Sequence, residues 1–289
     1  MRWLLLFLIP ALAGCLSSPD YVEEYVPPPL KRAEYSGAWP ELAQAVIRPG
    51  VQVVAEGGQC TANFLFRSAD NATLYLGLAA HCLGSAEDPL GVGTPVAIAG
   101  INNAGKVAYN HWEYEPSELN DFALIEISNS PSIRAKVHPA VMFFGGPTAM
   151  AKGSATTTGA HVLTYGHSGQ RPDSDPENPR EGYVLHHEEG QYLVWTDHPG
   201  IQGDSGSGLM TATGGALGVL SRGTTNPAPG TLANRDAPSL NFYVELDDLV
   251  ADARRLADLE VQLVTWPLLQ GGDLPLAGSA PPLLDERIG

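Results

Sequence analysis

Ser205 stands in the run GDSGSG, between glycines and directly after an acidic residue. Flanking glycines let the backbone turn sharply and leave room for a substrate carbonyl group, which is the setting that a nucleophilic serine needs. In such a turn, the N–H groups of Gly203 and Ser205 can point at one spot and stabilise the oxyanion that forms when the serine attacks. A Gly/Ser-rich turn between two strands is the alternative interpretation of this run taken alone.

Two further segments supply the groups that a serine nucleophile requires. His81 lies in LGLAAHCLG, and Asp121 opens the apolar run of NDFALIEI. A serine hydroxyl is a poor nucleophile at neutral pH, so it needs an imidazole to take its proton. The imidazole in turn needs a buried carboxylate that fixes its tautomer and stabilises its charged form. The order His81, Asp121, Ser205 is one of the chain orders in which this triad occurs.

Four segments together resemble a known family. AAHC, DFALI and GDSGSG resemble the histidine, aspartate and serine motifs of the trypsin-like (chymotrypsin-fold, family S1) serine proteases, and GVLSRG resembles the strand that lines their substrate cleft. The resemblance covers roughly residues 45–259. It implies a serine endopeptidase that hydrolyses peptide bonds through an acyl-enzyme, acts on protein or peptide substrates and requires no metal or organic cofactor.

The resemblance also indicates where a substrate binds. It implies that the backbones of Ser221 and Gly223 hold the substrate as an added antiparallel strand. It places Pro199, six residues before the nucleophile, at the base of the side-chain pocket. Gly200 and Gly223 leave space in that pocket. Arg222 has two interpretations, a cation that attracts acidic substrate residues or a solvated surface arginine.

The pocket residues argue against two common specificities. The uncharged base does not support a preference for Arg or Lys, although Asp197 lies two residues before Pro199 and an altered loop could bring it in. Leu220 stands where a glutamate-specific relative would have a histidine. We therefore expect a preference for apolar or medium-sized side chains.

The three cysteines have separate roles in this interpretation. Met1 and Arg2 precede an apolar stretch, and Leu-Ala-Gly-Cys at residues 12–15 resembles a bacterial lipoprotein cleavage box, with Cys15 as the lipidated mature N-terminus. That leaves Cys60 and Cys82, whose placement resembles the family's disulfide beside the catalytic histidine. Two buried thiols are the alternative. The protein is thus expected to be a lipid-anchored protein of the cell envelope, facing the periplasm or the exterior.

Composition and charge exclude some partners. The chain of 289 residues has 16 basic and 32 acidic side chains, a formal net charge of −16. No basic stripe is present to neutralise phosphates, which argues against nucleic acid. Attachment to a membrane would come from the N-terminal lipid only. We expect a monomer.

Periodicity predicts an all-β protein with one late helix. We expect a signal peptide at 1–14, a Pro-rich tether at 15–44, a protease domain at 45–264 and a C-terminal tail at 265–289. Short β-rich runs broken by Gly, Asn and Asp predict two six-stranded antiparallel β-barrels, at about 45–140 and 141–245. The strands of the second barrel include 141–144 and 154–158. Apolar residues at three- and four-residue intervals predict a C-terminal α-helix over about 246–259.

Activation by cleavage finds little support in the sequence. Many members of the family are cut to free an N-terminus that pairs with the acid before the serine, here Asp204. No clear cleavage site precedes the first strand, and Ala45-Val46-Ile47-Arg48 is a poor match. We hypothesise that the enzyme folds directly into an active form in which internal polar partners hold Asp204. Release from the membrane by a second cleavage is the competing hypothesis.

Other histidines do not indicate a metal site. His186 and His187 precede two glutamates, but neighbours on a strand point to opposite faces and converge poorly as ligands. Besides an active endopeptidase, two functions stay open. One is a catalytically silent binding or scaffold lipoprotein with a protease fold, and the other is an esterase that uses the same triad.

Overall fold

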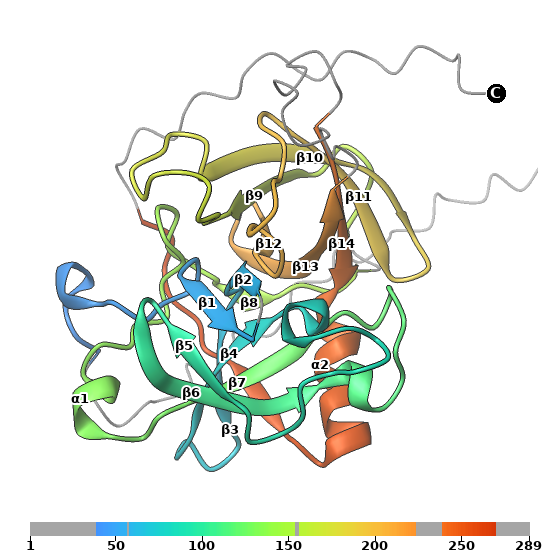
Figure 1. The fold of residues 1–289 in the computed structure, drawn as a ribbon. Helices are drawn as coiled ribbons and strands as arrows, with labels where there is room; N and C mark the ends of the chain where they lie inside the picture. The colour runs from blue at the N-terminus through green and yellow to red at the C-terminus, as the bar shows by residue number, and fades with distance from the viewer. Residues whose placement is uncertain (1–38, 57, 154–155, 224–238, 270–289) are drawn as a thin grey trace, which may run out of the picture. The chain divides into compact units, whose positions relative to one another are not determined.

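The computed structural model describes residues 39–56, 58–153, 156–223 and 239–269, and these are mostly β-strand. It has the predicted chymotrypsin-like, two-barrel fold with a C-terminal helix. In Figure 1 the first sheet is blue to green apart from β15, which lies near the red end of the bar, and the second is yellow to orange apart from the green β8.

The second sheet closes into a six-stranded antiparallel barrel. The sheet has seven strands, β8 (Ala149–Met150), β9 (His161–Tyr165), β10 (Pro179–Glu188), β11 (Gln191–Thr196), β12 (Gly208–Thr211), β13 (Gly215–Gly223) and β14 (Leu240–Glu245), and the last six of these form the barrel. The pairing order is β12-β9-β10-β11-β14-β13-β8, and β12 also pairs with β13, which closes the barrel. The short β8 joins as a parallel neighbour of β13.

The first sheet has eight strands. They are β1 (Gln52–Ala55), β2 (Gly58–Thr61), β3 (Leu65–Ser68), β4 (Leu74–Leu78), β5 (Pro95–Ile98), β6 (Ile101–Asn110), β7 (Ala123–Ile127) and β15 (Val261–Leu263), in the order β15-β3-β4-β7-β6-β5-β1-β2. The bend between β2 and β3 forms backbone hydrogen bonds on both of its sides. The Ala62 N–H donates to the Val51 carbonyl and the Asn63 N–H to the Gly77 carbonyl. This bend therefore links the residue before β1 to β4, and these two strands lie far apart in the sheet order.

The helix α2 (Leu246–Ala257) follows the last strand of the second barrel, as predicted. It buries Leu246, Leu249 and Ala253, which share one face at helical spacing. After the helix the chain adds β15 to the edge of β3, a strand that the sequence did not predict. Short helical turns are η1 (Leu42–Gln44), η2 (Ala80–Leu83), η3 (His111–Glu113) and α1 (Pro131–Arg134).

Apolar side chains from both barrels and α2 form the core. A large cluster includes Phe64, Phe66 and Phe122 and extends to the helix, and a smaller cluster in the second barrel includes Tyr192 and Tyr243. Burial of this apolar surface stabilises the sheets. The connecting loops, which carry His81, Asp121 and Ser205, are thus held on a rigid framework.

Two predicted strands of the second barrel do not form. The run 141–144 is apolar, but it is followed by Gly145 and Gly146 at φ +72° and +68°, and Phe143 itself has a positive φ. The backbone turns there instead of extending. Residues 156–158 are also outside any strand, whereas 154–155 are outside the described residues.

The N-terminal predictions concern residues that the structure does not describe. They are the signal peptide, Cys15 and nearly all of the tether, and the same holds for residues 270–289 of the tail. Within the described ranges, none of the helices has the length and apolar character needed to cross a membrane.

Candidate active site

Neighbouring strands bring His81 and Asp121 together. β4 and β7 pair antiparallel with Leu78 opposite Ala123, so the residues just after β4 and just before β7 lie at the same edge. His81 Nδ1 lies 2.7 Å from Asp121 Oδ2, and the His81 backbone N–H donates to Asp121 Oδ1 at 2.9 Å. The Asp121 side chain is only 1% exposed. The carboxylate therefore fixes both the ring and the backbone of His81.

Asp121 also controls the protonation of His81. Burial by itself lowers the pKa of His81, but the hydrogen bond and the negative charge of Asp121 outweigh it, so the pKa is raised above its usual value of 6.5. In the neutral ring, the proton on Nδ1 is assigned from its contact with Asp121. Nε2 then has a free lone pair and can accept a proton.

The Ser205 backbone is hydrogen-bonded to the first barrel close to His81. The Ser205 carbonyl oxygen accepts the Thr61 N–H at 2.9 Å and lies 3.9 Å from Cys82 Sγ. Cys82 follows His81 and is bonded to Cys60, the disulfide that the resemblance implies. Among the described residues, Ser205 Oγ makes no hydrogen bond, so the structure does not contain the Ser205–His81 bond itself. Catalytic hydrogen bonds are commonly long before substrate binds.

The loop before Ser205 leaves two N–H groups unpaired. Gly203 has φ +98°, and a Cβ atom at this position would lie 2.6 Å from Gln59 Oε1, so the turn requires glycine. The Gly203 carbonyl is held by Thr61 Oγ1 at 2.8 Å and by Gln59 Nε2 at 3.2 Å. Within the described part of the chain, no acceptor receives the N–H of Gly203 or of Ser205. Both remain available for an oxyanion.

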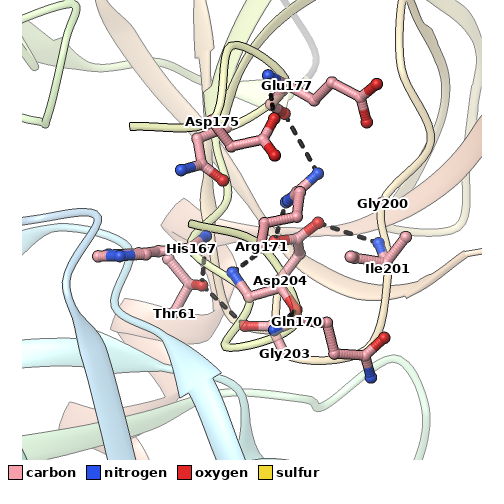
Figure 2. Close-up of polar contacts among 12 residues, drawn as sticks. Thr61, His167, Gln170, Arg171, Asp175, Glu177, Gly200, Ile201, Gly203 and Asp204 are labelled. Carbon is pink, nitrogen blue, oxygen red and sulfur yellow. Dashed lines mark hydrogen bonds and ion pairs between the residues drawn. The ribbon is translucent and has the colours of Figure 1, made fainter. Parts of the chain in front are cut away.

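Asp204 is completely buried between two arginines. Arg180 Nη1 donates to Asp204 Oδ2 at 2.8 Å, and Arg171 Nη2 donates to Asp204 Oδ1. The backbone N–H groups of Ser168 and Ile201 also donate to this carboxylate, at 3.1 and 2.9 Å. Figure 2 shows the Arg171 and Ile201 contacts with Asp204, next to the Thr61–Gly203 bond.

The arginines are oriented by the same loops. Arg171 Nη1 donates to the Glu177 carbonyl at 3.2 Å. Arg180 is fully buried, which lowers its pKa, but the charge of Asp204 more than compensates and the pKa is raised. Asp204 is therefore a fully paired anion whose hydrogen bonds fix the start of the serine loop.

A pocket of about 370 Å³ opens beside Ser205. Its lining residues are Gly200, Ile201, Gln202, Ser205, Leu220, Arg222, Gly223 and Asn241. Asn241 is buried, and its Oδ1 accepts the Gly200 N–H at 3.2 Å while its Nδ2 donates to Thr196 Oγ1 at 2.8 Å. A side chain next to a bond attacked by Ser205 can enter this pocket.

The predicted substrate residues divide into two groups. Gly200, Arg222 and Gly223 line the pocket, whereas Pro199 and Ser221 are not among its described lining residues. The Pro199 carbonyl accepts a hydrogen bond from Arg180 Nη1 at 3.1 Å, and Ser221 lies at an irregularity in the pairing of β13 with β14. Asp197 accepts the backbone N–H of Glu181 and is not a lining residue.

Several residues of the site carry no local sequence signal. Thr61, Arg171, Arg180 and Asn241 each bond to a residue at least 24 positions away. Such pairs are created by barrel closure, so no short motif marks them.

The histidine pair and the cysteines do not converge on a metal site. His186 contacts the exposed Glu188, whereas His187 stacks on Tyr192 and contacts Glu245. The ligand atoms of Cys60, His81 and Cys82 lie within 4.8 Å of one another, but the two sulfur atoms are joined in the disulfide and offer no thiolate.

Comparisons with known proteins find similar folds. No protein-family model and no curated protein matches the sequence. Among solved structures, the chain is similar to Thermobifida fusca protease A, with 20% identity and a TM-score of 0.49 over 76% of this chain and 99% of that one. A Glu endopeptidase in complex with MPD has 14% identity and a TM-score of 0.48, over 75% and 96%. The HtrA-type protease AlgW with tripeptide has 14% identity and a TM-score of 0.44, over 78% and 65%.

Proposed function

We propose that this protein is a serine endopeptidase in which Ser205, His81 and Asp121 form the catalytic triad. One observation carries the proposal. The His81–Asp121 pair lies beside a serine whose loop leaves two neighbouring backbone N–H groups unpaired. A base that is oriented by a buried carboxylate, together with an oxyanion site, is the minimum that acyl transfer needs.

The mechanism uses these groups in turn. His81 Nε2 takes the proton of Ser205 Oγ as the oxygen bonds to the scissile carbonyl carbon, and the carbonyl oxygen becomes an oxyanion bound by the amides of Gly203 and Ser205. His81 then gives its proton to the departing amine as the C–N bond breaks. Water attacks the acyl-enzyme, loses its proton to His81 and releases the acid, and the proton returns to Ser205.

We further propose that the enzyme needs no activating cleavage. Asp204 already accepts four hydrogen bonds, two of them from arginines. A new N-terminal amine would have to displace one of these partners. N-terminal sequencing of the active species tests this step, since a start near Val46 would contradict it.

The cell-envelope location is part of the proposal and rests on the sequence alone. Cys15 would carry the lipid and residues 15–44 would link it to a protease domain at 45–264. Metabolic labelling with palmitate should tag the wild type and fail to tag Cys15→Ser. Equal labelling of both would contradict lipidation at this cysteine.

A fluorophosphonate probe tests the catalytic site. Residues 17–289 should take a single adduct on Ser205, located by intact mass and peptide mapping, and Ser205→Ala should take none. A folded protein without an adduct would favour a protease fold that serves for binding.

A panel of peptide and ester substrates then separates an endopeptidase from an esterase, since hydrolysis of esters alone would contradict the proposed peptide substrates.

A further inference from the structure

Arg222 provides the only charged side chain among the described residues that line the pocket beside Ser205. The remaining lining side chains are apolar or neutral and polar. The whole chain is strongly acidic, with 32 acidic against 16 basic side chains, so a cation beside the nucleophile is contrary to the overall charge. A local field of this kind attracts an anionic group even when the net charge is negative.

The guanidinium of Arg222 is held in place by its own strand neighbours. Its carbon atom lies 4.6 Å from the centre of the Phe242 ring, and its Nη2 donates to Gln191 Oε1 at 3.4 Å. Cation–π contact and a hydrogen bond fix the side chain without neutralising it. Arg222 is therefore oriented on β13 and not simply extended into solvent.

Glu118 is the acidic partner of this arginine. It forms an ion pair with Arg222 Nη1 from the loop before Asp121, so the contact joins the loop of the first barrel to the strand of the second. Glu118 is 74% exposed, and among the described residues no other polar contact holds its side chain. An exposed ion pair of this kind is worth little and exchanges readily.

We propose that Arg222 selects a substrate carboxylate, and that Glu118 occupies this position until the substrate arrives. The inference rests on the proposed peptidase function and deepens it. An acidic side chain of a peptide bound along β13 displaces Glu118, and Arg222 keeps its place over Phe242. The Glu118 side chain, which has no second polar contact among the described residues, moves into solvent. This replaces the expectation of an apolar preference with one for Asp or Glu close to the scissile bond.

Peptide libraries provide the test. In each library one of four positions before the scissile bond carries Glu, Gln, Leu or Lys. At one position we expect kcat/KM for Glu to exceed that for Gln by at least about five-fold, since a hydrogen bond to a charged group exceeds one to a neutral group by this order. Arg222→Gln should bring the ratio of kcat/KM for Glu over Gln peptides close to one. Glu118→Gln should raise this ratio about two-fold, because it removes the carboxylate that competes with the substrate for Arg222. Arg254→Gln removes an exposed arginine outside the pocket and should keep the wild-type ratio.

Other results of these assays would contradict selection by Arg222. No position with a Glu preference, or a preference that Arg222→Gln retains, would overturn the inference. A preference for Lys that Glu118→Gln abolishes would identify Glu118 as the selecting residue and would also overturn it.

A binding measurement separates this inference from the proposed function. Ser205→Ala cannot form an acyl-enzyme, so fluorescence anisotropy with labelled Glu and Gln peptides reports selection without turnover. Tighter binding of Glu peptides, together with a wild type that neither cleaves peptides nor takes the fluorophosphonate, would support the selection and contradict the peptidase. Cleavage without a Glu preference would contradict only the selection by Arg222.

Discussion

At the scale of single residues, the proposed mechanism makes the reactivity of Ser205 depend on the protonation of His81. Asp121 raises the pKa of His81, and only the unprotonated ring can take the serine proton. Activity should therefore rise with pH through a midpoint above 6.5, the usual value for histidine. The rate of fluorophosphonate labelling between pH 5 and 9 measures this midpoint.

Asp121→Asn tests the effect of the Asp121 carboxylate on His81. It removes the charge that raises the pKa of His81, so the midpoint should move to lower pH. The labelling rate at its plateau should fall on the order of 10³- to 10⁴-fold because the ring loses its tautomer and orientation. A wild-type rate that does not change with pH would contradict the assignment of His81 as the base.

Arg180 is the second residue with a large expected effect. It is fully buried against Asp204, and its removal leaves this buried carboxylate with Arg171 as its one remaining cationic partner among the described residues. Arg180→Gln should lower the free energy of unfolding by about 3–5 kcal/mol in urea titrations. Arg254→Gln, at an exposed position on α2, should change it by less than about 0.5 kcal/mol. Similar losses in both variants would contradict a special role for the Asp204 cluster.

At the scale of elements, the loop before Ser205 is positioned from the other barrel. Thr61 Oγ1, on β2, accepts the His167 N–H at 2.9 Å and donates to the Gly203 carbonyl at 2.8 Å. These bonds orient the peptide that follows Gly203 and keep its carbonyl away from the proposed oxyanion site. Thr61 is therefore a positioning residue and does not itself touch the reacting atoms.

Thr61→Val tests this positioning. Valine has nearly the same shape but leaves the buried His167 N–H unpaired and the Gly203 carbonyl with Gln59 Nε2 as its remaining donor. We expect the maximal rate of peptide hydrolysis to fall about ten-fold with a smaller change in KM, since misplacement of an oxyanion-site donor acts on the transition state. Thr61→Ser keeps the hydroxyl and should restore most of the rate. Equal losses in both variants would point to packing and not to the hydroxyl.

The elements also show what can be predicted from the sequence. Two positions of GDSGSG require glycine, because Gly203 and Gly206 have positive φ. A short sequence motif was therefore enough to predict that loop. Alternating apolar residues likewise identified most strands. The prediction of a strand at 141–144 was wrong because the backbone turns there, with Phe143 at a positive φ. The strand β15 was missed because a three-residue edge strand has almost no periodicity. The arginines around Asp204 depend on barrel closure, which no local pattern contains.

At the scale of the whole molecule, three distant segments meet at His138. Its backbone N–H donates to the Ile47 carbonyl, its Nδ1 accepts the Ala140 N–H at 3.0 Å, and its ring makes an edge contact with Trp266 at 4.5 Å between centres. Trp266 in turn donates its backbone N–H to the Pro147 carbonyl. The segment before β1, the link between the barrels and the segment after β15 are thus joined around one buried imidazole.

This imidazole should make the stability of the fold depend on pH. Burial, and next the positive charge of Arg48, lower the pKa of His138 from 6.5 to about 4. Because the unfolded state binds the proton first, stability is fully present above pH 6.5 and is lost as pH falls towards 4. The loss at pH 4 should be on the order of 2–3 kcal/mol.

His138→Asn retains an acceptor for Ala140 but does not titrate, so urea unfolding at pH 7 and pH 4 should show a smaller difference than in the wild type. The same substitution at the exposed His186 is the control. If His138→Asn shows the full wild-type difference, the acid sensitivity arises elsewhere and the junction at His138 does not control it.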